Sequence, residues 1–320
     1  MDTSQWVDDF LAYLRAERGC SELTVLNYRG RLEHFRAYVK RTDAHLDWDC
    51  VDSDVVRGWI VEQMEGGKRP SSVNTSLTPL RSFYRYLLMM GRVMHNPMTR
   101  VASPKAGKPL PKFFRDSDVN RLLDNLKHQA DGEEPETGEM SLTAVTGSGE
   151  FERVRAYLII LMLYATGMRI GELRELRVND VDFGAMQLKV TGKRNKQRII
   201  PMLDELADAI RRYLPLRDEI LARKGSAGAE QLMLSVRGRR MTGKSLYDLV
   251  TGLTGTVTSQ KRRSPHVFRH TFATSMINAG SDLQSVKELL GHASLNTTQV
   301  YTHTNFEQLR SVYNNAHPRG

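Results

Sequence analysis

Apolar residues recur at every third or fourth position through the first hundred residues, which is the spacing of one stripe along a helix. Residues 6–18 and 52–65 add two more stretches, so four helices are predicted. Ser21 and Ser71 are the predicted N-caps of two of them. Together they predict an all-α bundle over residues 1–98. The two clearest stripes are Val25, Tyr28, Leu32, Phe35 and Tyr38, and Asn74, Leu77, Leu80, Phe83, Tyr84 and Leu87.

A polar, proline-rich segment follows the bundle. Residues 103–111 contain three prolines and a glycine. Proline removes a backbone donor and restrains the residue before it, so a helix does not pass through such a segment. We therefore predict an interdomain linker over residues 99–111 and a second domain over residues 112–320.

The second domain combines helices with one hairpin. A helix is predicted from residue 116 to 128 with Asp116 or Ser117 as its cap, and residues 154–165 are apolar on nearly every side, as in a buried helix that Gly167 ends. Residues 186–190 alternate between apolar and polar, a polar turn follows, and residues 197–201 resume the alternation. This pattern predicts a β-hairpin.

The C-terminal part of the chain is predicted to be helical again. Ser264 and Pro265 have the order of an N-cap and first helical residue, and Gly280 ends that helix. Ser281 and Gln284 predict a capping box for the next one. The fold class is thus mainly α with a small β-hairpin. A last helix near the end of the chain carries a stripe with nothing after it to cover it: Phe306, Leu309, Val312 and Tyr313.

Composition narrows the class of protein. The 320 residues are 40% hydrophobic and 26% charged, which is enough apolar material for a real core and excludes a disordered chain. The longest apolar run, residues 157–165, is about half of what a membrane span needs, and no signal peptide is recognisable. The two cysteines, Cys20 and Cys50, are too few for a disulfide framework. A soluble cytoplasmic protein is predicted, without membrane insertion.

The charge is unevenly distributed. The formal net charge is +9, of which residues 1–100 contribute +1 and residues 101–320 contribute +8. An acidic segment, predicted as a loop over about residues 129–149, makes the remainder of the second domain more basic still. Lys and Arg release counterions when they neutralise phosphates, so a nucleic acid is the expected partner. An anionic membrane surface is the alternative, although no basic amphipathic helix stands out.

Six side chains in short segments of the second domain suit one chemistry. Singly, each has an ordinary explanation, such as a surface salt bridge or a core tyrosine. His266 and His270 have the spacing of a helical metal-ligand pair, but Val267 replaces the acid of an HExxH motif. As a set, they suit a phosphodiester, because paired guanidiniums bind its oxygens and no acidic cluster offers a Mg²⁺ site. The six candidates are Arg169, Lys193, His266, Arg269, His292 and Tyr301.

A tyrosine is a weak nucleophile while it is protonated, since its pKa is about 10. A histidine can assist removal of that proton. Lys193 is predicted at the tip of the hairpin, where it can protonate the departing 5′ oxygen. His266 and Arg269 are predicted on one face of the first turn of a helix, beside its unpaired N–H groups.

In order and spacing, the six candidates resemble the R, K, HxxR, H and Y signature of the tyrosine recombinases, the phage integrase family. The short motifs around two of them are also similar to those of the family. They are Leu-Leu-Gly-His at residues 289–292 and Thr-Thr-Gln-Val-Tyr-Thr-His at residues 297–303. Within the family, the chain is most similar to the bacterial XerC/XerD group, with a tail after Tyr301 more like XerC. The resemblance extends over the whole chain.

The resemblance implies a fold and a mechanism. Residues 1–98 would be the SAM-like core-binding domain, which forms a C-shaped clamp on double-stranded DNA with the catalytic domain. Tyr301 would attack the scissile phosphate, Arg169 and Arg269 would clamp it with help from His292, His266 would take the nucleophile's proton, and Lys193 would serve the leaving oxygen. No metal, cofactor or ATP is implied.

The resemblance further implies a tetramer on DNA with a XerD-like partner, a septal DNA translocase, and chromosome dimer resolution at cell division. The apolar stripe from Phe306 to Tyr313 would dock on a neighbouring protomer, or fold back on its own domain. Alternatives are a mobile-element integrase, a type IB topoisomerase, and a non-catalytic DNA-binding or architectural protein. The acidic loop at about residues 129–149 is longer than the family usually has between these helices. A species-specific spacer is one interpretation, and contact with a basic surface of a partner is a hypothesis motivated by its charge.

Overall fold

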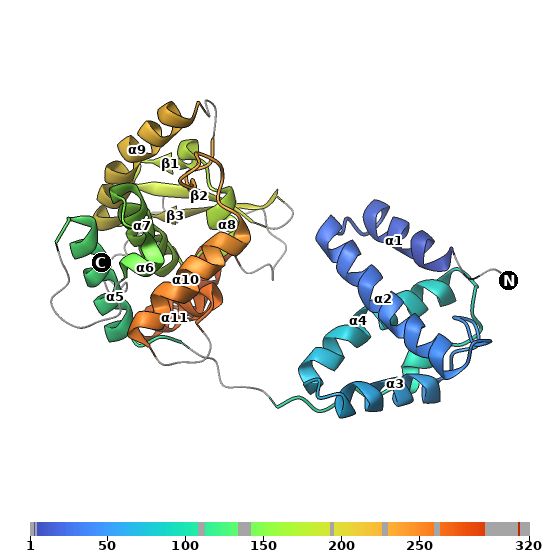
Figure 1. Cartoon of the computed structure of the whole chain (residues 1–320). Helices are drawn as coiled ribbons and strands as arrows, with labels where there is room; N and C mark the ends of the chain where they lie inside the picture. Colours follow the sequence, from blue (N-terminus) through green and yellow to red (C-terminus); the bar gives the residue numbers. More distant parts are fainter. Residues whose placement is uncertain are drawn as a thin grey trace. The chain divides into compact units, whose positions relative to one another are not determined.

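The computed structural model describes residue 3 and residues 5–107, 113–133, 142–192, 195–225, 230–258, 263–291 and 313. The chain divides into two compact units, residues 1–109 and 110–320. Both units are shown in Figure 1, coloured along the sequence. The helices far outnumber the strands, which confirms the predicted fold class.

The first unit is a helical bundle. It contains α1 (Trp6–Ala16), α2 (Glu22–Thr42), α3 (Ser53–Glu65), α4 (Pro70–Met89) and the 3-10 turn η1 (Pro97–Arg100). The four predicted helices are thus confirmed, and the two predicted stripes face a core rich in aromatic rings. In that core Trp48 meets Phe83 edge to face with ring centroids 4.8 Å apart, and Phe35 meets Trp59 at 5.3 Å.

One predicted cap was right and one was wrong. Ser21 caps α2, since its hydroxyl accepts a hydrogen bond from the Thr24 amide. Ser71 does not cap α4, which already begins at Pro70 with Arg69 in the N-cap place. The fixed φ of proline suits the first helical position, so α4 begins at Pro70 and Ser71 is already inside the helix.

Part of the predicted linker packs against α4. Val101 is buried in the core of the first unit. The Asn74 side chain donates to the Pro104 carbonyl at 2.9 Å, and the Arg81 guanidinium donates to the Ser103 hydroxyl at 2.9 Å. Residues 101–104 therefore belong structurally to the first unit, and the domain division at 98 and 112 remains a prediction.

The second unit surrounds one buried helix, α7 (Glu150–Thr166), whose residues from Val154 to Thr166 are all buried. Helices α5 (Asp116–Ala130), α9 (Asp204–Lys224) and α11 (Pro265–Asn278) pack against it. The remaining helical elements are α6 (Thr143–Thr146), α8 (Ile170–Glu175), η2 (Val178–Asp180), α10 (Gly243–Val257) and α12 (Leu283–Leu290). The predicted central helix is confirmed.

A small antiparallel sheet lies in this unit, beside α8 in Figure 1. Its strands β1 (Val181–Asp182), β2 (Gln187–Thr191) and β3 (Gln197–Pro201) follow one another in order. In the register of β2 and β3, Leu188 is opposite Ile200 and Val190 is opposite Arg198. The predicted hairpin is confirmed, and β1 is an addition to it.

Two local predictions in this unit need correction. Helix α5 begins after Arg115 and has no side-chain cap, so neither Asp116 nor Ser117 caps it. Helix α12 is capped by Asp282, whose carboxylate accepts from the Gln284 and Ser285 amides, and not by Ser281. The Asp282 carboxylate satisfies two of the first amides of the helix, and its charge lies at the positive end of the helix dipole.

The predicted acidic loop is partly helical. Gln129 and Ala130 are the last residues of α5, and residues 143–146 form α6. Val145 of α6 packs against α10 at Gly252, where a Cβ would lie only 2.7 Å from a Val145 methyl. This apolar contact explains why α6 forms, while the acidic residues 134, 136 and 139 lie outside the described residues.

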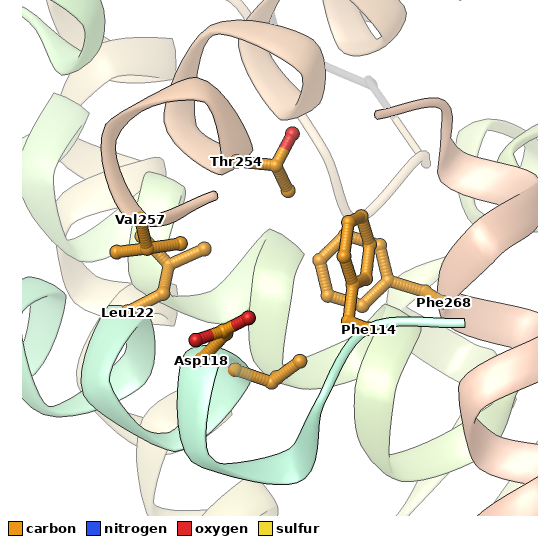
Figure 2. Close-up of a pocket in the computed structure, with 7 residues that line it drawn as sticks. Phe114, Asp118, Leu122, Thr254, Val257 and Phe268 are labelled. Atoms are coloured by element: carbon orange, nitrogen blue, oxygen red, sulfur yellow. The ribbon is translucent and has the colours of Figure 1, made fainter. Parts of the chain in front are cut away.

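Helix α11 is held on one side by aromatic packing. Figure 2 shows a small, mainly apolar crevice between α5, α10 and α11, with Phe114 and Phe268 facing each other across one end. Their ring centroids are 5.0 Å apart, and the Phe114 amide donates to the Thr271 hydroxyl at 2.9 Å. Because Phe268 faces this crevice, its neighbour Arg269 is turned toward a different part of the unit.

Of the predicted C-terminal stripe, only Tyr313 is described. Its ring is fully buried in the core of the second unit, 6.4 Å from the Phe272 ring, and its hydroxyl donates to the Ala165 carbonyl at 2.6 Å. At this residue the tail lies on its own unit, which is the second of the two predicted alternatives. The described helices include none that is long and apolar enough to cross a membrane.

Gly167, at the end of α7, tolerates no side chain. Its φ is +58°, and an added Cβ would lie 2.6 Å from the Phe272 ring and 2.9 Å from a Leu290 methyl. We expect Gly167→Ala to lower the free energy of unfolding by about 3 kcal/mol, through backbone strain and overpacking together. Urea denaturation of the full chain measures it.

Gly225 offers the matched control. It also ends a helix with positive φ, +61°, but nothing lies within 4 Å of its Cβ position. Gly225→Ala should therefore cost only the backbone term, about 1 kcal/mol. Equal losses in the two variants would show that Phe272 and Leu290 do not crowd Gly167.

Candidate active site

Arg169 lies in a sharp connection between two helices. Gly167 ends α7 in a left-handed conformation, and Arg169 occupies the N-cap place of α8. Its amide donates to Glu172 Oε2 at 2.8 Å, and its Nη1 donates to Glu172 Oε1 at 2.7 Å. About a third of the Arg169 side chain remains exposed, 33%, so the guanidinium is fixed yet accessible.

Arg269 approaches the same connection from α11. It is 8% exposed, and it donates from Nη1 to the Gly167 carbonyl at 3.0 Å and from Nη2 to the Leu290 carbonyl at 2.5 Å. Within the part of the chain that the structure describes, these contacts use two of its five N–H donors, which leaves three for a ligand. The structure thus brings Arg169 and Arg269, one hundred residues apart in the chain, to one place.

A third arginine completes the cluster. Arg198 on β3 donates from Nη1 to Glu172 Oε1 at 3.2 Å and from Nη2 to Glu172 Oε2 at 2.8 Å. Its Nε donates to the Leu289 carbonyl at 2.8 Å. Arg198 and Glu172 are each 6% exposed, so this is a buried, bidentate ion pair.

The electrostatics of the cluster favour an anion. Burial, together with the charges of Arg169 and Arg198, lowers the pKa of Arg269 to about 10, so it is still protonated at neutral pH. Burial opposes ionisation of Glu172, but hydrogen bonds from Arg198 and Arg169 outweigh it and hold its pKa below the usual value. Two of the three cations, Arg169 and Arg198, share the Glu172 carboxylate, and an incoming phosphate would relieve the remaining repulsion among the three.

Half of the predicted site residues are described. Arg169 and Arg269 meet as above, and His266 is exposed on the first turn of α11, three residues before Arg269. The other three, Lys193, His292 and Tyr301, lie outside the described residues. Their described neighbours Gly192 and Gly291 both lie against the arginine cluster, because a Cβ would lie 3.8 Å from Arg198 at Gly192 and 3.1 Å from it at Gly291.

Sequence reasoning missed Glu172 and Arg198. Glu172 has a local signal, since it lies three residues after Arg169 as the acid of a capping box. Arg198 has no comparable signal: it lies in the second strand of the predicted hairpin, and the structure shows that it is buried inside β3. It faces the core together with Ile200, as the alternation of the strand requires.

The Glu172 carboxylate gives a pH-dependent prediction. Glu172→Gln leaves two arginines without their shared counter-charge, and we expect the free energy of unfolding at pH 7 to fall by about 3 kcal/mol. Because the folded-state pKa of Glu172 is lowered, its contribution is complete above the ordinary value of 4.5 and is lost as pH falls through the folded pKa. Denaturation from pH 7 to pH 3 should show wild type and variant converging at the acidic end.

An exposed glutamate serves as the control. Glu175 also pairs with two arginines, Arg174 and Arg240, but 43% of its side chain is exposed. Glu175→Gln should change the unfolding free energy by less than about 1 kcal/mol. A Glu172→Gln loss as small as this, or one that does not shrink at low pH, would contradict the buried ion pair.

Comparison with known proteins places these features in a family. Residues 112–308 match the model of the phage integrase family, and residues 7–91 match that of the phage integrase N-terminal SAM-like domain. The chain is 33% identical to the tyrosine recombinase XerC of Chlorobaculum tepidum over 98% of its length and 95% of the relative's. It is 32% identical to the tyrosine recombinase XerD of Listeria innocua, with 98% of each chain covered.

Solved structures agree in fold. The XerH site-specific recombinase bound to a palindromic difH substrate superposes with a TM-score of 0.66 at 20% identity, covering 95% of this chain and 83% of that one. A lambda integrase dimer bound to a core site gives 0.64 at 18% identity, covering 94% of this chain and 100% of that one. At these identities the likeness extends to the fold alone.

Proposed function

Because the chain belongs to the phage integrase family and is a DNA strand-transferase of the tyrosine recombinase type, we propose that Tyr301 is its nucleophile. The Tyr301 oxygen attacks the scissile phosphorus, forms a 3′-phosphotyrosyl bond and releases a 5′-hydroxyl. One phosphoester replaces another, so the bond energy is kept for the reverse step with a second strand. The observation that carries the proposal is the arginine cluster: Arg169 and Arg198 share the Glu172 carboxylate, and Arg269 donates to the Gly167 carbonyl, two residues before Arg169.

Arg169 and Arg269 bind the non-bridging oxygens of that phosphate. Among the described residues, each guanidinium has donors that no partner uses, and the backbone and side-chain contacts of both fix them before DNA arrives. Such preorganised cations stabilise the charge that builds up during phosphoryl transfer. His292, one residue after the αL residue Gly291, adds a further hydrogen bond to the phosphate.

Two other side chains move protons. His266, exposed on the first turn of α11, accepts the phenol proton of Tyr301 as attack proceeds. Lys193, one residue after Gly192, gives a proton to the departing 5′ oxygen. The phenol proton and the lysine proton thus account for both oxygens that change partners.

The cellular role proposed for this chemistry is resolution of chromosome dimers at cell division. Full-length relatives named XerC and XerD support it. The chain would act in the cytoplasm, within a tetramer on double-stranded DNA that includes a XerD-like partner, under control of a septal DNA translocase. Tyr313 lies on its own unit here, so docking of the tail on a neighbouring protomer in such a tetramer would require Tyr313 to leave that position.

Covalent selection tests the proposal without a known target site. The purified protein is incubated with sheared DNA of its own host carrying random nicks, and fragments that survive boiling in detergent while attached to protein are sequenced. We expect one enriched sequence with two half-sites, present at a single chromosomal place. Enrichment at the ends of a mobile element instead would assign the integrase role, and no covalently attached DNA would contradict the proposed activity.

A further inference from the structure

We propose that Arg198 is a positioning residue, which sets the places of catalytic groups on three separate segments of the site. The proposal rests on the function proposed above, because the groups that it positions are those proposed to cleave DNA. Its basis is a set of contacts that Arg198 makes with the residues next to, or paired with, each of those groups.

All three nitrogens of the Arg198 guanidinium are in use. Nη1 and Nη2 grip both oxygens of Glu172 at 3.2 Å and 2.8 Å, while Nε donates to the Leu289 carbonyl at 2.8 Å. A planar fork matches a carboxylate in this way, whereas a lysine ammonium offers only a point charge. The side chain is 6% exposed, so water does not replace these contacts.

The first segment contains Arg169. The two oxygens that Arg198 holds are the same two that accept the Arg169 amide at 2.8 Å and the Arg169 Nη1 at 2.7 Å. Rotation of the Glu172 carboxylate would therefore move the Arg169 guanidinium with it. Because Arg198 binds both oxygens of the carboxylate, it holds Glu172 against that rotation.

The second segment is the β2–β3 hairpin. Gly192, the residue before Lys193, packs on the ion pair so closely that a Cβ there would lie 3.3 Å from Glu172 Oε1 and 3.8 Å from Arg198 Nη1. The Gly192 amide also donates to the Lys196 carbonyl at 2.8 Å, which closes the base of the turn. The stem from which Lys193 departs is thus seated on Arg198 and Glu172.

The third segment is the end of α12. The last carbonyls of a helix have no partners within it. Here the Leu289 carbonyl accepts a hydrogen bond from Arg198, and the Leu290 carbonyl accepts one from Arg269. Gly291 follows with φ +64°, and its Cβ position is 3.1 Å from Arg198 Cδ. His292 is the next residue in the sequence, so Arg198 holds the described residue from which the proposed catalytic histidine continues.

The test separates positioning from stability. We expect Arg198→Lys to lower the single-turnover rate of covalent adduct formation on a nicked duplex by about a hundredfold, the effect of misplaced catalytic groups. The dissociation constant for the same DNA should change by less than about threefold. Circular dichroism confirms that the variant is folded at the assay temperature.

Arg217→Lys is the matched control. Arg217 is another buried arginine of the second unit, 5% exposed, and it donates to the Gln231 carbonyl at 3.0 Å. Arg217→Lys should lower the free energy of unfolding about as much as Arg198→Lys does, and its cleavage rate should stay within about twofold of the wild-type rate. If Arg217→Lys slows cleavage as much as Arg198→Lys does, stability alone explains the loss and the proposal is overturned.

A double-mutant cycle with Glu172→Gln asks whether Arg198 acts through its partner. The double variant should cleave no more than about threefold slower than the slower single variant, because both changes remove the same Arg198–Glu172 ion pair. Fully multiplicative losses would mean that Arg198 acts independently of Glu172, contrary to the proposal.

Gly192→Ala extends the test if Arg198→Lys does not fold. It adds one methyl group against Glu172 and removes no contact of the pair, and we expect a rate loss of about tenfold with DNA binding retained. A wild-type cleavage rate in every variant that folds would refute positioning by Arg198. Failure of the wild-type protein to form any adduct would instead refute the proposed function, so the two failures are distinguishable.

Discussion

Replacing Arg269 with alanine is expected to lower the rate of DNA strand cleavage by at least about a thousandfold, while DNA binding weakens by less than about tenfold. The guanidinium is proposed to stabilise charge that appears only in transfer of the phosphoryl group, so its loss acts on the rate. The free energy of duplex binding comes from many phosphate contacts, so the loss of one contact removes only a small part of it. Single-turnover cleavage and gel-shift titration on the same duplex measure the two quantities.

The alanine variant also leaves the Gly167 and Leu290 carbonyls without a donor, so its folding must be compared with wild type. Arg269→Lys keeps a charge at the site and is expected to recover less than about a tenth of the lost rate, because an ammonium cannot serve both carbonyls and a phosphate. Arg223→Ala, an exposed arginine on α9, should cleave normally. Wild-type cleavage by folded Arg269→Ala would remove Arg269 from the proposed site.

Tyr301→Phe is expected to abolish covalent attachment to DNA altogether. The substitution removes a single oxygen, the proposed nucleophile, and a phenylalanine ring offers no atom that could accept the phosphoryl group. DNA binding should stay within about twofold, since the ring is retained. The measurement is a denaturing gel of protein incubated with a nicked duplex whose short cleaved fragment diffuses away.

Tyr247 provides the control for that variant. It lies on α10 of the same unit with 45% of its surface exposed. Tyr247→Phe should form adduct at the wild-type rate. Adduct that persists in Tyr301→Phe and disappears in Tyr247→Phe would reassign the nucleophile.

The elements that the sequence predicted well are those whose signal is local. The stripe through Val25, Leu32 and Phe35 repeats within one helix, and Gly167 marks the end of α7 one residue past its last turn. Helix α9 was not predicted, although Leu206, Ile210 and Tyr213 recur at the helical spacing and are buried. Its stripe was available in the sequence and was not used.

The environment of the catalytic groups could not be predicted in this way. Arg198 lies among the charged residues of a hairpin, and its burial depends on Glu172, 26 residues away, and on Leu289, 91 residues away. Local pattern has no access to such partners, so a buried arginine and an exposed one have the same signal. The six candidate residues were recognised by their order and spacing. The contacts of Arg198 with Glu172 and Leu289, which join their segments, appear only in three dimensions.

The most direct test of the account is to locate the covalent bond. Protein trapped on a nicked duplex is digested with nuclease and trypsin, and the peptide that retains a nucleotide is sequenced by mass spectrometry. The account predicts a single modified peptide, with the nucleotide joined through its 3′ phosphate to Tyr301. A nucleotide on any other residue, or bound protein that yields no modified peptide, would contradict it.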